Sequence, residues 1–362
     1  MHGGRIYAYA ESDGIPVESI LDFSANLHPC GPPASVLEAV QSALPLIQHY
    51  PDERQRRVKE VLSERFNVPT ESLVCGNGAS EVMELVFRTV KPQRTWILEP
   101  AFGEYEAIAR RCGSHIMHCT LRQDDAFTLP LAALSEWVSE GDMVVINTPH
   151  NPSGRHFPKS SWFDAARSWT KRGVHVLVDE SFLDFMERDE VESGMCESVH
   201  NPRWHTIRSA TKIFAIPGLR FGFAVLHPDM AQRVNANRDG WSVNALAQVA
   251  VAAAYQEPSW LVQTYRWLAQ AHAFAHSTWG ADARIRMFPF DVNFFLIRLK
   301  SEDLSLLIQR ELRRRGLYVR NCESFRFLGP AYIRIALRTE AENRTLWQTF
   351  SDLLDRASER FG

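Results

Sequence analysis

The sequence predicts an α/β protein whose large domain has three layers around a mostly parallel sheet, followed by a smaller α+β C-terminal domain. Two observations indicate this fold. From about residue 55 to 245, short β-rich runs alternate with longer helical patterns, as in βα units. After a helical stretch over about 243–282, the pattern changes to short strands and two helices, which predicts a separate lobe with a small antiparallel sheet.

The expected strands of the large domain are short and apolar. Near-continuous apolarity in "MVVIN" (143–147) and "VHVLVD" (174–179) is typical of strands that helices cover on both faces. The other expected strands lie at 73–76, 95–99, 115–119, 204–208 and 221–226. Ligands bind beyond the carboxyl ends of the strands in such open sheets, so we look for a site in the residues that follow these runs.

The smaller domain has strand patterns in "VNFFLIRL", "LYVR" and "YIRIAL", with helices expected around 303–315 and from about 340. We expect the N-terminal segment to complete its sheet. The predicted division is an N-terminal segment over 1–45 that packs on the small domain and active site, a large domain over 46–245 and a small domain over 246–362. No repeat or low-complexity linker separates them, which predicts closely packed lobes.

Composition excludes several classes of protein. A net charge of −3 over 362 residues gives no basic surface for nucleic acid. No apolar run approaches the roughly 18 to 20 residues that a membrane span needs. The N-terminus lacks a basic region followed by an apolar core, so we expect no secretory signal and a cytoplasmic protein.

Metal and disulfide frameworks are also not expected. The six cysteines are scattered without CxxC spacing, and we expect them to be buried thiols. The segment "HIMHC" (115–119) and the pair His272 and His276 offer imidazoles without an evident third ligand. We therefore predict no metal site.

Polar residues follow several of the expected strands. "CGNGAS" (75–80) opens a helical run, so Gly78, Ala79 and Ser80 can offer backbone N–H groups and a hydroxyl to a phosphate at a helix N-terminus. "NTPHNPSG" (147–154) places Asn151 in a turn, and Asp179 ends the next strand. These strand ends are expected to converge on one crevice.

The segment "RSATKIFAIPGLRFG" (208–222) gathers three cations and two hydroxyls around a Pro-Gly turn. These residues are Arg208, Ser209, Thr211, Lys212 and Arg220. Cations and hydroxyls between two buried strands predict that an anion binds there.

The order and spacing of these segments, with "VDESFLDF" and a late arginine in "YIRIALR", resemble the fold type I pyridoxal-phosphate enzymes, the aspartate aminotransferase superfamily. The resemblance covers nearly the whole chain. It implies that Lys212 forms a Schiff base with the cofactor aldehyde. It further implies that Ser209, Thr211 and Arg220 bind the cofactor phosphate together with the helix start at 78–80.

The resemblance also assigns residues to the cofactor ring and to a second subunit. Asp179 would pair with the pyridine nitrogen, and Asn151 would hydrogen-bond the ring hydroxyl oxygen. Phe102 in "PAFGEY" would stack on the ring, with Tyr105 as the weaker candidate for that place. Tyr50 in "HYPD" matches a tyrosine that reaches the cofactor phosphate of the neighbouring subunit, which implies a homodimer with shared active sites.

Within this superfamily, "HGG", "LDFSANLHPCG" and "WSVNALA" resemble the threonine-phosphate decarboxylases of cobalamin synthesis. Phe182 stands where the aminotransferases usually carry a tyrosine. The expected reaction converts L-threonine O-3-phosphate to (R)-1-amino-2-propanol O-2-phosphate and CO2, for the cobalamin nucleotide loop. The alternatives are histidinol-phosphate aminotransferase activity with 2-oxoglutarate, decarboxylation of L-serine O-phosphate, and a non-enzymatic effector-binding module.

The resemblance extends to residues that would bind a small phosphorylated amino acid. Arg320 in "YVRNC" and Arg334 in "YIRIAL" match the late arginines of the family, and we assign them jointly to the anionic substrate groups. His2 and Asn26 are further candidates for the substrate pocket. Arg338 is the weakest candidate, because a surface position suits it equally well.

Overall fold

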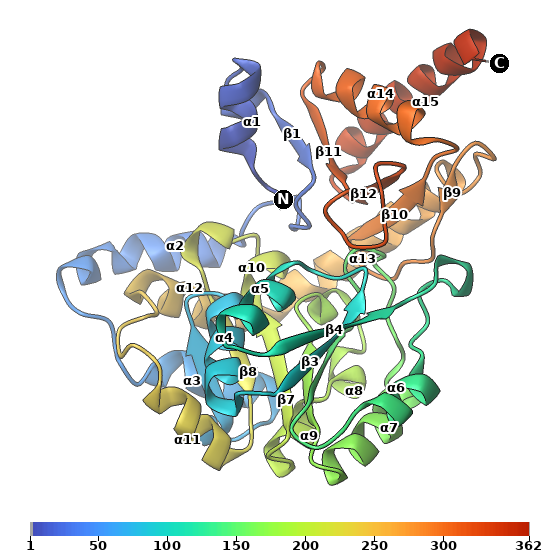
Figure 1. The fold of residues 1–362 in the computed structure, drawn as a ribbon. Helices are drawn as coiled ribbons and strands as arrows, with labels where there is room; N and C mark the ends of the chain where they lie inside the picture. The colour runs from blue at the N-terminus through green and yellow to red at the C-terminus, as the bar shows by residue number, and fades with distance from the viewer. Residues whose placement is uncertain (1–2, 362) are drawn as a thin grey trace.

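The computed structural model describes residues 3–361, which form two lobes (Figure 1). The large lobe contains a seven-stranded sheet with the order β2-β8-β7-β6-β5-β3-β4. Its strands are β2 (Leu73–Gly76), β3 (Arg94–Glu99), β4 (His115–Thr120), β5 (Met143–Asn147), β6 (His175–Asp179), β7 (Trp204–Ser209) and β8 (Gly222–Val225). The strands from β7 to β4 pair in parallel, and β8 is antiparallel to both its neighbours. The predicted mostly parallel α/β fold is confirmed.

Helices cover both faces of this sheet, because alternate residues of its buried strands are apolar on each face. On one face α4, α5 and α11 enclose Val74, Ile97 and Leu177. On the other, α3 and α12 cover the β2–β8 end while α6 and α7 cover the β5–β6 end. These helices are α3 (Arg56–Phe66), α4 (Ala79–Val90), α5 (Glu104–Arg111), α6 (Leu131–Trp137), α7 (Lys159–Lys171), α11 (Pro228–Ala236) and α12 (Ala245–Tyr255).

The small lobe contains a five-stranded sheet with the order β1-β11-β12-β10-β9. Its elements are β1 (Leu21–Phe23), β9 (Arg286–Met287), β10 (Phe294–Arg298), β11 (Leu317–Asn321) and β12 (Tyr332–Ala336), with α14 (Glu302–Arg313) and α15 (Glu340–Phe361). The N-terminal segment completes this sheet, as predicted, but β1 pairs with β11 in parallel, so the sheet is not wholly antiparallel.

Further helices connect these elements. They are α1 (Ile6–Asp13), α2 (Ala34–Ala43), α8 (Asp189–Glu192), α9 (Met195–His200), α10 (Ala210–Ile213) and the long α13 (Pro258–Ser277). The helical stretch expected over about 243–282 consists of two helices. α12 ends at Tyr255 and α13 begins at Pro258, because proline favours a helix start and cannot continue the preceding helix. Within 3–361, no helix is both long and apolar enough to cross a bilayer.

The expectation of buried cysteines holds for Cys75, Cys119 and Cys322. It is wrong for Cys30 and Cys196, which are exposed. Cys30 lies in a turn after β1 and Cys196 lies on the short helix α9, so neither belongs to an element that faces the core on all sides.

A part-buried histidine at the start of β6, His175, packs on a fully buried histidine within β7, His205. His175 and His205 stack with ring centroids 5.3 Å apart, and His175 Nδ1 lies 3.0 Å from His205 Nε2. Burial, with the positive charges of Arg203 and Arg233, lowers the pKa of His175 to about 4. Burial also lowers the pKa of His205 well below its ordinary value.

We therefore predict that acid destabilises this part of the sheet. Since the folded pKa lies below the unfolded value of about 6.5, the unfolded chain binds more protons, and stability falls as pH drops from about 6.5 to about 4. For His175 the loss is on the order of 3 kcal/mol. Urea unfolding of the parent and of His205→Leu at pH 7.5 and pH 5 measures it. The variant should show a smaller pH dependence, and an unchanged dependence would contradict the assignment.

Candidate active site

A cavity of about 350 Å³ lies beyond the carboxyl ends of the large sheet, where the N-terminal segment and the small lobe meet it. Most of the predicted site residues line it: Asn26, Gly78, Ala79, Ser80, Phe102, Asn151, Asp179, Ser209, Thr211, Lys212, Arg220, Arg320 and Arg334. They come from segments up to about 300 residues apart in the chain. The chain fold therefore brings the strand ends and the late arginines to one place.

Lys212 lies on the short helix α10 and projects its amine into this cavity. Burial and the positive charges of Arg220 and Arg334 lower the pKa of the amine to about 8, against the opposing charge of Asp179. The main-chain carbonyl of Lys212 accepts a hydrogen bond of 3.0 Å from His28 N, which ties the N-terminal segment to the site. The neutral, nucleophilic form of this amine is thus far more accessible near neutral pH than that of an ordinary lysine.

The first turn of α4 and the end of the 208–222 segment form a cationic cradle. A side-chain carbon at Gly78 would lie 2.4 Å from Arg220 Nη2, so only glycine lets the guanidinium approach the helix start. Gly222 has the same function on the strand side, since a carbon there would lie 2.2 Å from Ala79 N. Ser209 Oγ and Thr211 Oγ1 are 2.8 Å apart beside it. Helix N–H groups, hydroxyls and a guanidinium together suit a phosphate.

Asp179 ends β6 with a buried carboxylate that faces the cavity. Its main-chain carbonyl accepts a hydrogen bond of 3.0 Å from Asn147 Nδ2, at the end of the neighbouring strand β5. Asn147 Oδ1 in turn accepts from Asn151 N at 2.8 Å. Asn147 therefore fixes the positions of both residues that the sequence assigned to the cofactor ring.

Two arginines enter the cavity from neighbouring strands of the small sheet. Arg320 on β11 and Arg334 on β12 are paired in register, and their residues are only 6% and 5% exposed. Arg334 Nη1 donates to Asn151 Oδ1 and Nη2 to Ser24 O, both at 2.6 Å. Arg320 Nη2 donates to Ser324 Oγ at 2.7 Å. Like charges on paired strand residues repel, so an anion between them is stabilising.

Burial lowers the pKa of the Arg334 guanidinium to about 10, which still leaves it charged at neutral pH. Arg334 Nε and Asn26 Oδ1 are buried polar atoms of the cavity wall without a hydrogen-bond partner among the described residues. Buried polar atoms are costly unless they are paired. They are therefore suited to a polar ligand.

Two of the predicted residues lie away from the cavity. Tyr50 is 78% exposed and stacks on Trp241 with centroids 4.5 Å apart, away from the cavity of its own chain. Arg338 contacts Asp22 O and the Glu342 carboxylate outside the cavity. His2 lies outside the described residues.

Phe182 lines the cavity and packs edge-on against Phe294.

The sequence grouped Arg208 with the anion-binding cations, and the structure corrects this. Arg208 is fully buried on the opposite face of the sheet, where Nε contacts Glu180 at 3.0 Å and Nη1 contacts Asp184 at 2.6 Å. Side chains alternate along a strand, so Arg208 must face away when Ser209 faces the cavity.

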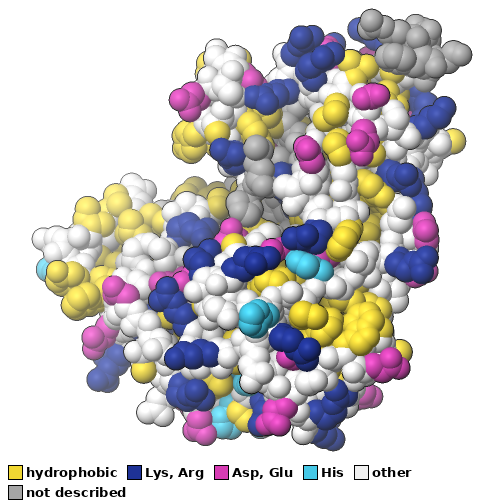
Figure 2. Space-filling model, viewed as in Figure 1, with side chains coloured by type: hydrophobic (Ala, Val, Ile, Leu, Met, Phe, Trp, Pro, Cys, Tyr) yellow, Lys and Arg dark blue, Asp and Glu magenta, His cyan; other side chains and the backbone are white. Residues whose placement is uncertain are grey.

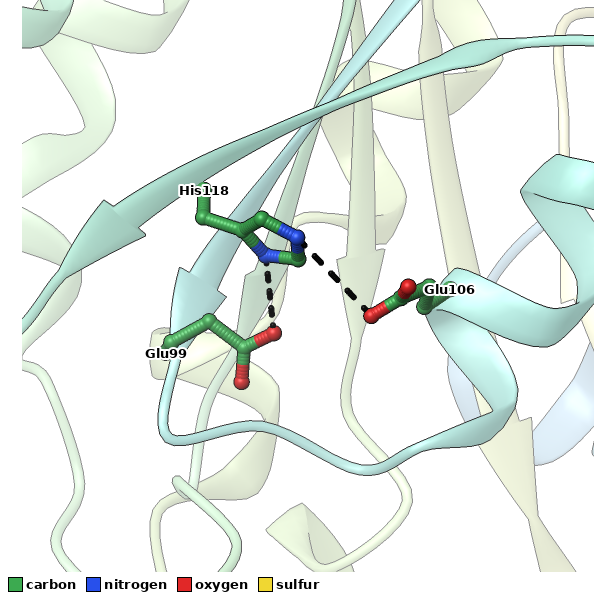
Figure 3. Close-up of side chains that lie close together, drawn as sticks. All are labelled: Glu99, Glu106 and His118. Atoms are coloured by element: carbon green, nitrogen blue, oxygen red, sulfur yellow. Dashed lines mark hydrogen bonds and ion pairs between the residues drawn. The ribbon is translucent and has the colours of Figure 1, made fainter. Parts of the chain in front are cut away.

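His118 belongs to a polar cluster beside the site (Figure 3). Its two ring nitrogens lie 3.2 Å from Glu99 Oε1 and 3.9 Å from Glu106 Oε2. Three such ligands could in principle hold a metal ion. The Arg326 guanidinium, however, lies 3.1 Å from the Glu106 carboxylate and 3.8 Å from that of Glu99, so a protein cation already neutralises this cluster.

Sequence reasoning missed several cavity residues, among them Ser24, Asn147, Ser181, Ser324 and Phe325. Ser181 had a signal, since a serine two residues after an aspartate often donates to its carboxylate in a turn. Ser24 and Ser324 had none, because their place depends on how the small lobe meets the large one.

The cavity fits pyridoxal phosphate. A reactive amine of lowered pKa, a buried carboxylate, a ring-sized apolar wall at Phe102 and a glycine-lined cationic cradle are the groups that its aldehyde, pyridine nitrogen, ring and phosphate need. Bound there, the cofactor would accept electrons from the substrate Cα.

Comparisons with known proteins agree with this geometry. The family model for aminotransferase class I and II matches residues 18–350. The chain is 33% identical to the threonine-phosphate decarboxylase of Salmonella typhimurium, over 98% of this chain and 96% of the relative. It is 27% identical to the histidinol-phosphate aminotransferase of Oleidesulfovibrio alaskensis, over 93% and 88%.

The fold is also similar to a solved structure that holds the cofactor. The histidinol-phosphate aminotransferase of Sinorhizobium meliloti, in complex with pyridoxal-5'-phosphate, aligns with a TM-score of 0.85 at 19% identity, covering 97% of this chain and 95% of that one.

Lys212→Met is expected to prevent covalent attachment of the cofactor and to stabilise the apoprotein at pH 7. The unfolded amine binds a proton more tightly than the folded one, so the parent gains stability between about pH 8 and its unfolded pKa of 10.5, while the variant does not. Intact mass after borohydride reduction and apoprotein melting at pH 7 and pH 10 measure the two effects. Cofactor mass on the variant, or a melting difference that does not shrink at pH 10, would be incompatible with this role.

Proposed function

We propose that this chain, which belongs to the aminotransferase class I and II family and uses pyridoxal phosphate, decarboxylates L-threonine O-3-phosphate. The products are (R)-1-amino-2-propanol O-2-phosphate and CO2, for assembly of the cobalamin nucleotide loop. The 33% identity to a threonine-phosphate decarboxylase over nearly the full length of both chains supports this choice.

The observation that carries the proposal is the paired register of Arg320 and Arg334 in one cavity with Lys212. Threonine phosphate has two anionic groups, a carboxylate and a phosphate, on either side of its Cα. Two guanidinium groups from neighbouring strands can bind both and orient the molecule across the cavity. Phe182 lines the cavity with an apolar ring, at the position where the aminotransferases of the superfamily usually carry a tyrosine.

The residues of the chain have distinct parts in this reaction. Arg320 and Arg334 bind the substrate anions, and Asn151 together with Ser24 O fixes the Arg334 guanidinium. The bound cofactor would accept the electrons of the bond that breaks at Cα, and these contacts would orient the substrate so that this bond is the one to the carboxylate. Lys212 Nζ, whose pKa is about 8, can hold a proton near neutral pH and deliver it to Cα.

Purified protein should release CO2 from threonine phosphate without any keto acid. Arg334→Gln should lower kcat/KM by roughly a hundredfold, because a charge-assisted contact to the substrate is lost in a buried site. Arg338→Gln is the matched control outside the cavity and should stay within about twofold of the parent. Serine phosphate is assayed beside it, since one methyl group changes the specificity by only about 1–3 kcal/mol.

The second candidate function is amino transfer from histidinol phosphate, which the 27% identity to a histidinol-phosphate aminotransferase favours. The same assay with histidinol phosphate and 2-oxoglutarate distinguishes the two. Glutamate formation without CO2 release from threonine phosphate would replace the decarboxylase by the aminotransferase.

The proposed active unit is a homodimer. Leu37, Leu46 and Ile47 are 56%, 43% and 71% exposed beside the exposed Tyr50, and Figure 2 shows hydrophobic side chains gathered at the left edge of the molecule, over α2. Exposed apolar patches of this kind mark protein interfaces. A second copy that covers this patch would bring Tyr50 toward the partner's cofactor phosphate.

Mixing two inactive variants tests whether the sites are shared. Lys212→Met supplies an intact Tyr50, and Tyr50→Ala supplies an intact Lys212. After unfolding and refolding together at equal amounts, activity should rise toward about a quarter of the parent's, since half of the dimers are mixed and each has one intact site. Sedimentation gives the mass. A monomer, or no recovery in a dimer, would contradict shared sites.

A further inference from the structure

The Asp179 carboxylate is held by three hydrogen-bond donors of the chain itself. Oδ1 accepts from Ser181 N at 2.9 Å and from Ser181 Oγ at 2.5 Å, and Oδ2 accepts from Tyr105 Oη at 2.5 Å. A carboxylate has about four acceptor positions. The hydrogen bonds of the described residues thus leave one position, and it is on Oδ2.

The surroundings of Tyr105 keep its hydroxyl protonated, so that it donates a hydrogen bond to Asp179. Tyr105 is the second residue of α5 and is 2% exposed, and its ring packs edge-on against Phe102 with centroids 5.7 Å apart. Burial and the negative charge of Asp179 raise the pKa of the phenol well above its ordinary value, so its proton stays in place.

Ion pairs of the neighbouring residue also restrain the position of Tyr105. The next residue, Glu106, contacts Arg326 of the small lobe at 3.1 Å and Arg110 of the same helix at 2.7 Å. The start of α5 is therefore held by both lobes. A hydroxyl so restrained can restrict the rotation of the carboxylate that it contacts.

We infer that Tyr105 is a positioning residue for the cofactor: its hydroxyl orients the Asp179 carboxylate so that the remaining acceptor position on Oδ2 receives the pyridine N–H. The sequence considered Tyr105 as a ring that stacks on the cofactor. Its hydroxyl contact instead gives it a function that phenylalanine cannot perform. This inference depends on the cofactor alone and holds for a decarboxylase and an aminotransferase alike.

Tyr105→Phe tests it, because one oxygen is removed while the ring remains. The variant should bind pyridoxal phosphate about tenfold more weakly, as expected for the loss of a hydrogen bond to a charged group. Binding is measured by quenching of tryptophan fluorescence in the apoprotein. The analogue with carbon in place of the ring nitrogen is titrated in parallel, and for it parent and variant should agree within about twofold.

Tyr255→Phe is the matched control. Tyr255 is also a buried tyrosine whose hydroxyl donates to a buried aspartate, Asp184 Oδ2 at 3.2 Å, but it does not line the cavity. Both variants should lower apoprotein melting to a similar extent, and the control should leave cofactor affinity unchanged. Ser181→Ala, which removes a donor from Oδ1, provides a second test if Tyr105→Phe does not fold.

Two outcomes would overturn the inference. One is an unchanged dissociation constant for pyridoxal phosphate in Tyr105→Phe, or in Ser181→Ala where that variant replaces it. The other is an equal loss of affinity for pyridoxal phosphate and for the analogue, since that would show a general disturbance of the cavity.

Discussion

The active site depends on a buried ion pair behind it. At the ends of β6 and β7, polar residues face the cavity on one side of the sheet and oppositely charged residues pair in the core on the other side. Asp179 and Ser209 face the cavity, while their neighbours Glu180 and Arg208 face the core behind it. The Arg208–Glu180 contact of 3.0 Å therefore joins the two strand ends that carry Asp179 and Ser209 of the cavity. Breaking such a buried pair costs about 3–5 kcal/mol, because it leaves an uncompensated charge in the core.

The cavity is lined by residues of the small lobe and the N-terminal segment as well as by residues of the large sheet. β1 pairs with β11, and the chain just after β1 supplies Ser24 O to Arg334 and His28 N to the Lys212 carbonyl. Arg334 and Lys212 of the cavity are thus connected through one segment near the start of the chain. A change in how the lobes meet would alter the distance between the anion-binding groups and the reactive amine.

The fold was predictable because strand and helix patterns are local, and the strand ends then follow from topology. Arg208 could have been placed by the alternation rule alone, since it cannot share a face with Ser209. The boundary between α12 and α13 also had a local signal, because Pro258 favours a helix start. The contact of Tyr105 with Asp179 was not predictable, because it depends on where the start of α5 lies relative to the end of β6. The roles assigned to the cavity residues remain predictions.

The cations of the site affect the lysine as well as the ligands. Arg220 and Arg334 lower the pKa of Lys212 in the unliganded chain, which favours the neutral amine that attacks an aldehyde. A substrate anion bound to Arg334 would offset part of that positive charge, so the same amine would then hold a proton more tightly. A lysine that first acts as a nucleophile and later delivers a proton to Cα needs this order of states. The arrangement therefore couples occupation of the anion sites to the protonation that the proposed reaction requires.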